Sequence, residues 1–286
     1  MIARIALLTV AVLAVLAGPA KGRGFERVGS TAHQPFSDGT ALVWQATGAA
    51  LELRRPATGQ RRRIAVPSGC RLADVATSRH ALVSCGGGAA AGYVLGLRTA
   101  GRVALPRASF LTVDRIGAHW VEGYFNPGCY HCDSQVFRNW RTGEERAFDG
   151  MDAIQTDLDD PELPRLPGRI VARHRDVSVV YGERLVAVVD GQRRRLSACL
   201  YDCESFTAWN GRVSWIEGRS LSPGVLREVD LRTRRERSWP MRLAGRGADY
   251  ATSVRIRSAL YVGVPMSSPL GRPFPLRGRY RLLRAR

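Results

Sequence analysis

Apolar residues after position 25 gather in short runs that are rich in β-branched and aromatic side chains. Each run is bounded by Gly, Pro, Asp or Asn, and this combination is typical of β-strands. No stretch beyond residue 25 keeps a helical period for three turns. The pattern therefore predicts an all-β protein, and its clearest strands are "ALVW", "YVLGL", "VSVVY", "LVAVV", "RVSWI" and "ALYVGV".

One type of strand returns at regular intervals along the chain. The distances between successive copies are 40, 37, 59, 35 and 47 residues. Most of these values are close to the ~40–50 residues that a four-stranded propeller blade occupies. The copies begin near Ala41, Ala81, Ala118, Val177, Arg212 and Ala259.

A second phrase recurs between these copies as a strand, a tight turn and a returning strand. Its turns read "ATGQR", "RTGEE" and "VDGQR", and Gly59, Gly143 and Gly191 can adopt a positive φ at little cost. We interpret the phrase as the outer hairpin of each blade.

A single blade cannot bury both of its faces, whereas a closed ring of blades can. Six units can be drawn, and the segment "FERVGS" at 25–30 is expected to pair with the last blade and close the ring. The sequence thus predicts one domain over residues 25–286, a six-bladed β-propeller, with five or seven blades or a two-domain sandwich as alternatives. The units span 33–67, 72–106, 110–148, 152–198, 205–240 and 249–285.

Two segments resemble the repeats of TolB-like and WD-type six-bladed propellers. "SDGTALVW" at 37–44 is similar to their turn-and-strand segment, and "VDLRT" at 229–233 is similar to the strand that ends in Asp-x-x-Thr-Gly. The resemblance implies the fold alone. The chain has no room for the N-terminal α/β domain of TolB, and no functional residue is carried over.

The first twenty residues form a segment of a different kind. Arg4 is followed by an apolar run over 5–17 and then by small residues, which is the layout of a secretory signal peptide over 1–20. The run is shorter than the ~20 residues that span a bilayer, although an uncleaved anchor is the alternative. We expect a secreted or extracytoplasmic protein, outside the cell envelope or in the periplasm, with no transmembrane segment after cleavage.

Six cysteines follow the signal segment, and an even count in an exported chain indicates disulfides. Their closeness in sequence favours the bridges 70–85, 129–132 and 199–203 among fifteen possible connectivities. Zinc binding by "CYHC" and "CLYDC" is the rival interpretation. Placed on the predicted blades, all six fall on one face of the ring: Cys70, Cys85, Cys129, Cys132, Cys199 and Cys203.

The same face is predicted to carry an acidic insertion that accounts for the 59-residue spacing. It holds six acids within residues 149–162 of a chain whose net charge is +18. A solvated loop, a calcium site at Asp157, Asp159 and Asp160, and a carboxylate pair for glycoside cleavage are three interpretations. The candidate binding residues in this insertion are Asp152, Asp157, Asp159, Asp160 and Glu162.

The positive charge is carried almost entirely by arginine, much of it in the predicted outer hairpins. A basic rim could hold an anionic polymer, but solvated outer strands are the preferred interpretation. The sequence contains no G-x-S-x-G, H-E-x-x-H or phosphate-binding glycine motif. We therefore expect a monomeric binding module that holds a protein or glycan on the loop-rich face with the cysteines, without catalytic residues or a cofactor other than calcium. The alternative is an extracellular hydrolase or lyase acting on a polysaccharide.

Overall fold

The computed structural model describes residues 24–31, 33–46, 50–76, 78–125, 134–149, 158, 169–174, 177–181, 184–197, 203–218, 224–241, 251–265 and 280–286. The predicted signal peptide lies outside these residues. Within them, no helix has the length and apolar character needed to cross a bilayer.

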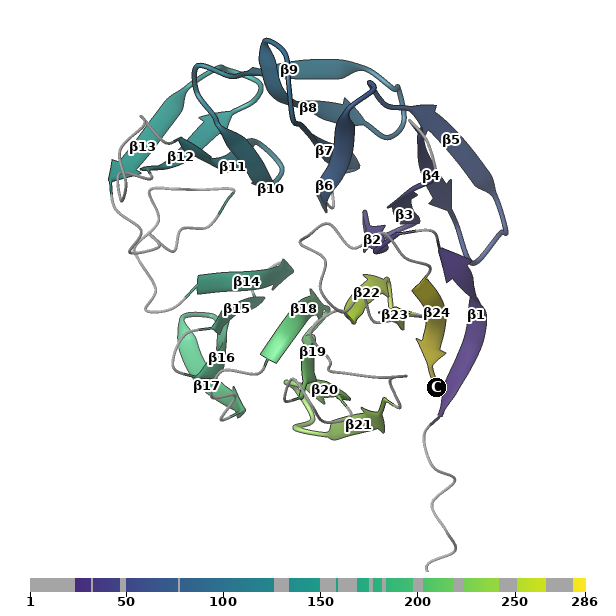
Figure 1. Cartoon of the computed structure of the whole chain (residues 1–286). Coiled ribbons are helices and arrows are strands. Elements are labelled where there is room, and N and C mark those ends of the chain that lie inside the picture. The colour runs from purple at the N-terminus through teal and green to yellow at the C-terminus, as the bar shows by residue number, and fades with distance from the viewer. Residues whose placement is uncertain are drawn as a thin grey trace, which may run out of the picture.

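Six antiparallel four-stranded sheets surround a common centre, as the repeat spacing predicted (Figure 1). The first three blades are β2 (Phe36–Ser37), β3 (Leu42–Gln45), β4 (Ala50–Arg54) and β5 (Arg61–Ala65); β6 (Cys70–Ala76), β7 (His80–Cys85), β8 (Ala90–Gly96) and β9 (Arg102–Pro106); and β10 (Thr112–Ile116), β11 (Trp120–Phe125), β12 (Ser134–Asn139) and β13 (Glu145–Asp149).

The remaining blades complete the ring. They are β14 (Arg169–His174), β15 (Val177–Tyr181), β16 (Leu185–Val189) and β17 (Gln192–Ser197); β18 (Cys203–Trp209), β19 (Arg212–Glu217), β20 (Val225–Asp230) and β21 (Glu236–Pro240); and β22 (Thr252–Ile256), β23 (Ala259–Pro265) and β24 (Tyr280–Ala285) with β1 (Phe25–Thr31). We number them blades 1 to 6 in this order. The recurring strand predicted from the sequence is the second strand of each blade.

The ring is closed by the two ends of the described chain. Strand β1 pairs antiparallel with β24, from Phe25 opposite Ala285 to Thr31 opposite Tyr280. Figure 1 shows β1 as the outermost strand of blade 6, beside β24. The predicted closure by residues 25–30 is therefore confirmed, and it joins the N-terminal segment to the last blade through backbone hydrogen bonds.

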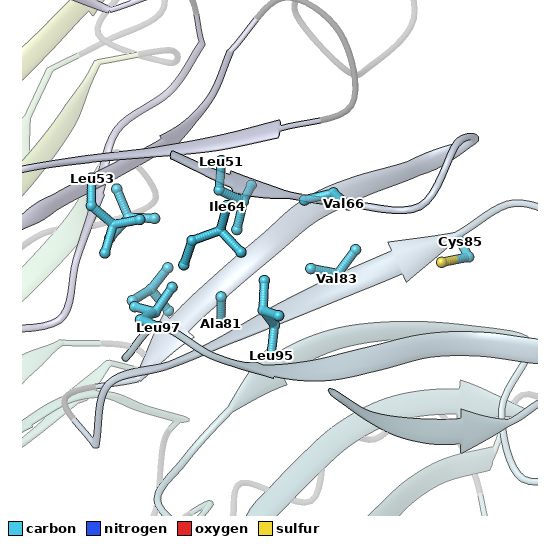
Figure 2. Packing of buried hydrophobic residues seen from close by; sticks show 11 residues of the cluster. Leu51, Leu53, Ile64, Val66, Ala81, Val83, Cys85, Leu95 and Leu97 are labelled. Atoms are coloured by element: carbon cyan, nitrogen blue, oxygen red, sulfur yellow. The ribbon is translucent and has the colours of Figure 1, made fainter. Parts of the chain in front are cut away.

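Apolar side chains from neighbouring blades form the core. One cluster joins Leu51, Leu53 and Ile64 of blade 1 to Val83 and Leu97 of blade 2, and Figure 2 shows these side chains pointing toward one another. Comparable clusters join blades 2 and 3, blades 4 and 5, and blade 5 to blade 6. Burial between sheets is the dominant stabilising term, so each blade depends on its neighbours.

The outer hairpins have the turns that the sequence predicted. Gly59, Gly143 and Gly191 adopt φ values of 69°, 81° and 74°. A residue with a Cβ would be strained in this left-handed region, which explains why glycine recurs in the phrase. In blades 2 and 5, Ala100 and Arg234 adopt φ values of 61° and 57° in the corresponding hairpins, so glycine is favoured at this turn but not required. The sixth blade has no third-to-fourth strand turn, because its fourth strand comes from the start of the chain.

Candidate functional site

Alternate strand connections in each blade emerge on opposite faces of the ring. We call the side with the loops between second and third strands, and with the connections between blades, the loop face. The side with the first-to-second and third-to-fourth strand turns is the hairpin face. This definition follows from the antiparallel strand order.

The disulfide predicted between Cys70 and Cys85 lies at the loop face. The two residues are opposite each other at the start of β6 and the end of β7, and their Cα atoms are 4.1 Å apart. Cys203 at the start of β18 is also disulfide-bonded. The other three cysteines, Cys129, Cys132 and Cys199, lie outside the described residues, so the bridge 129–132 and the partner of Cys203 stay predictions.

Apart from positions 149 and 158, the acidic insertion also lies outside the described residues. This applies to all five candidate ligand residues, Asp152, Asp157, Asp159, Asp160 and Glu162. In the part of the chain that the structure describes, His, Cys, Asp and Glu side chains form no group of three that could hold a metal ion. The calcium site consequently remains a prediction.

Buried ionic groups connect blade 5 to blade 6 close to the inner strands. Arg255 of β22 reaches across to blade 5, where its Nη2 donates to Glu228 Oε2 and lies 3.3 Å from Ser214 Oγ. Burial lowers the pKa of Arg255, and the bond to Glu228 counteracts this shift. Removing one partner of such a pair would leave a buried charge without compensation, so the pair holds the two blades together.

A second acidic side chain, that of the half-buried Asp74, connects blade 2 to blade 3. The Asp74 carboxylate on β6 accepts the backbone N–H groups of Val75 at 2.8 Å and Ile116 at 3.0 Å. Burial raises the pKa of Asp74, and these two hydrogen bonds act in the opposite direction. In blade 3, Arg115 Nε lies 2.9 Å from Glu122 Oε2. Glu228, Asp74 and Glu122 therefore form hydrogen bonds or ion pairs with other residues of the propeller, and their role is structural.

The hairpin face contains a cavity of about 610 Å³ at the junction of blades 4 and 5. Ligand pockets are commonly ~300–1,000 Å³ in volume, so the cavity can enclose a small molecule or one or two sugar units. Apolar walls come from Val177, Val189, Leu231 and Trp209, and the polar lining comes from Arg194, Arg212, Asp230, Arg232, Asn210 and Ser258.

Two tight turns of blade 5 shape one side of the cavity. Asn210 and Gly211 join β18 to β19 with φ values of 45° and 74°, as a two-residue hairpin with Asn-Gly requires. Asp230 Oδ1 accepts the backbone N–H groups of Arg232 at 3.1 Å and Thr233 at 3.0 Å. The hydrogen bond from Thr233 is the main reason that the pKa of Asp230 is lowered. Asp230 is therefore ionised, and its Oδ1 is occupied by the two N–H groups of the turn.

Blade 4 supplies the opposite side and fixes the position of the turns. Arg194 on β17 donates from Nη1 to the Leu231 carbonyl at 2.9 Å. The backbone N–H of Asn210 donates to His174 Nδ1 at 3.0 Å, and the His174 ring lies 4.5 Å from the Trp209 ring between centroids. The cavity is thus held by hydrogen bonds between the two blades.

Sequence reasoning located part of this site. It placed much of the arginine on the outer hairpins, and Arg194 and Arg232 are exposed there. It missed Trp209, Arg212 and Asp230 as members of one site. The Asn-Gly pair at 210–211 could have indicated the tight turn, but nothing in one sequence shows which turns of neighbouring blades enclose a space.

The sequence matches no protein-family model and no curated protein. Among solved structures, the chain is similar to regucalcin from Agrobacterium tumefaciens, described as a calcium-binding protein. The TM-score is 0.50 at 13% identity, and the match covers 93% of this chain and 95% of that chain.

Two further solved structures are similar to this chain. An acylaminoacyl peptidase from Pyrococcus horikoshii matches with a TM-score of 0.53 at 10% identity, over 83% of this chain and 49% of that one. TolB from Acinetobacter baumannii matches with a TM-score of 0.45 at 10% identity, over 86% and 63%. Identities this low are informative about the fold alone. The protein is a six-bladed β-propeller, which is the fold that the resemblance to propeller repeats implied.

Proposed function

We propose that this propeller is an exported, non-catalytic binding module that holds its ligand at the hairpin-face cavity between blades 4 and 5. The observation that carries the proposal is the cavity itself, which has apolar walls, several hydrogen-bond donors and a volume suited to a ligand. Asp230, the carboxylate in its described lining, already accepts two backbone N–H groups and lies 3.5 Å from Arg212. A general base needs a carboxylate that can reach a substrate proton.

The Cys70–Cys85 disulfide supports export. Structural disulfides form and persist in oxidising compartments and are rare in the cytosol. The bridge joins the first residue of β6 to the last residue of β7 and fixes the loop face near the ring centre. A second binding surface for a protein or glycan on that face is the corresponding proposal for the loops and the acidic insertion.

A pair of serine substitutions can test the cavity as the binding site. Ser258 is exposed and lines the cavity, whereas Ser238 is exposed on β21 and does not. We expect Ser258→Trp to abolish saturable binding in ligand-observed NMR with a panel of small carboxylates, sugars and their neutral analogues. Ser238→Trp, with the same added volume, should bind as the wild type does.

The same panel separates binding from catalysis. Recovery of every bound compound unchanged after prolonged incubation is the expected outcome, and polysaccharides should release no new reducing ends. Release of products by the wild type and not by Ser258→Trp would contradict the proposal and favour the hydrolase or lyase. Equal binding by both tryptophan variants would place the ligand elsewhere.

A further inference from the structure

The charges around the cavity differ sharply from its apolar interior. Its described lining contains the guanidinium groups of Arg194, Arg212 and Arg232 and the single carboxylate of Asp230. Three positive charges against one negative charge leave an excess of two in a cavity that is lined by residues of blades 4, 5 and 6. Charges of one sign that line a concave, low-dielectric site attract a ligand of the opposite sign.

The three arginines form different contacts within the protein. Arg194 uses one N–H for the Leu231 carbonyl, at 2.9 Å, and Arg212 Nε lies 3.5 Å from Asp230 Oδ2. No described residue forms an ion pair with the exposed Arg232 side chain. A guanidinium has five N–H donors in a planar fork, so each arginine keeps donors for an oxyanion.

The apolar part of the lining restricts the ligand further. Val177 and Val189 belong to blade 4, Leu231 belongs to blade 5, and the partly exposed Trp209 adds an aromatic ring held beside His174. A bare inorganic anion would leave this apolar surface without a contact. A ligand with a compact apolar or ring-shaped body could cover that surface and gain the free energy of its burial.

From these two features, and resting on the proposed function, we propose that the cavity binds a small organic anion. The ligand carries a carboxylate or similar oxyanion toward Arg232 and Arg212 and places a compact ring or hydrocarbon body against Trp209 and the valines. The ligand class follows from the cavity lining in blades 4 and 5 and does not involve the acidic insertion.

Two naphthalene derivatives of nearly the same shape can test the anionic part. We would titrate the full-length exported protein with 1-naphthoate and with neutral 1-naphthamide by isothermal calorimetry. A charge-assisted hydrogen bond is worth enough to change an affinity by about tenfold or more. We therefore expect 1-naphthoate to bind at least about tenfold more tightly than the amide. Inorganic phosphate, used as a third probe, should displace 1-naphthoate poorly because it lacks the apolar body.

A matched pair of arginine substitutions tests the position. Arg232→Gln should weaken 1-naphthoate binding about tenfold, because it removes donors from the cavity. Arg235→Gln removes the same charge from an exposed residue of the same hairpin that does not line the cavity, and we expect an effect below about twofold from its longer-range field. Neither guanidinium is in a described ion pair, so both variants are expected to fold, which circular dichroism can verify.

The outcomes distinguish this inference from the proposed function. Equal affinities for the acid and the amide, both lost in Ser258→Trp, would overturn the anion preference while supporting the cavity as a binding site. Equal losses in Arg232→Gln and Arg235→Gln would show diffuse surface attraction and overturn the assignment. Binding that survives Ser258→Trp would overturn both proposals.

Discussion

Two junctions between neighbouring blades share one framework. At the junction of blades 1 and 2, Arg62 Nη1 donates to the Leu97 carbonyl at 3.1 Å, and at the junction of blades 4 and 5, Arg194 Nη1 donates to the Leu231 carbonyl at 2.9 Å. Each leucine also donates its backbone N–H to the first turn of its own blade, at 2.9 and 2.8 Å. The repeat therefore preserves these contacts three blades apart.

The side chains inside this framework are different. Leu53 is opposite Arg62 in the register of β4 and β5 and packs in the core cluster of Figure 2. The corresponding residue opposite Arg194 is Ala187. The smaller alanine fills less of the layer beneath the arginine, and the junction of blades 4 and 5 is the one where the cavity described above is found.

The polar residues differ at one paired position as well. Blade 2 has His80 opposite Gly96, whereas blade 5 has Arg212 opposite Asp230. The backbone N–H of Gly96 and that of Asp230 make equivalent turn hydrogen bonds, to Gly101 and Arg235, so the position is structurally the same. Hydrogen bonds to backbone carbonyls are thus the same at both junctions. The side chains that do not form these bonds differ, and they determine the charge and shape of each junction.

The largest expected effect comes from making blade 1 similar to blade 4. Leu53 is 9% exposed, and Leu53→Ala should lower the free energy of unfolding by about 2–3 kcal/mol because it removes core contacts and leaves a cavity. Urea denaturation monitored by tryptophan fluorescence can measure this change. Leu111 is 51% exposed, and Leu111→Ala should change the stability by less than about 0.5 kcal/mol.

A loss below about 1 kcal/mol in Leu53→Ala would contradict the comparison, since it would mean that the junction collapses around the alanine. The smaller side chain of Ala187 would then not account for the cavity at the junction of blades 4 and 5.

The blade framework could be predicted from the sequence because it repeats along the chain. Blade spacing, the glycine turns at 59, 143 and 191, and the pairing of 25–30 with the last blade follow from patterns that each blade must satisfy. The Cys70–Cys85 bridge was found because its two strands are adjacent in sequence. These features depend on local or repeated constraints.

The contacts that cross between blades could not be predicted in the same way. Arg255 meets Glu228 from another blade, 27 residues away, and no spacing rule links the two. The cavity requires Val177, Trp209 and Ser258 of three different blades, and each occupies a position where other blades carry unrelated side chains. One sequence shows the repeat but does not show which departures from it come together.

The next prediction concerns the two equivalent arginines. Arg194→Gln should lower the free energy of unfolding by about 1 kcal/mol, the usual net value of one hydrogen bond. Arg62→Gln should lower it by about 1–2 kcal/mol, because Arg62 Nη1 also donates to the Arg98 carbonyl. Arg194→Gln should additionally weaken 1-naphthoate binding, whereas Arg62→Gln should not. Thermal unfolding and calorimetry on the two variants measure both quantities. Equal binding losses would show that the arginines act through the net charge of the protein and not through the junction.

The smallest effect concerns the charge of Asp230, and a neighbouring blade shows how to isolate it. Asn139 occupies the equivalent place in blade 3, where its Oδ1 accepts two turn N–H groups at 3.0 and 3.2 Å. Asp230→Asn can therefore keep the turn and remove only the charge. Because the pKa of folded Asp230 is lowered, its ionised form stabilises the protein above the ordinary aspartate pKa of about 3.9.

We therefore expect wild type to exceed Asp230→Asn in stability by less than about 1 kcal/mol at pH 6, since the carboxylate is partly exposed. This advantage should disappear as the pH falls through the folded-state pKa.

Asp74 should show a pH dependence of stability with the opposite sign, because burial raises its pKa. A raised pKa stabilises the protonated form, so the stability of wild type relative to Asp74→Asn should increase as the pH falls from 6 to 3. Urea unfolding at both pH values measures the two slopes, and slopes of equal sign would contradict the different environments inferred for the two acids.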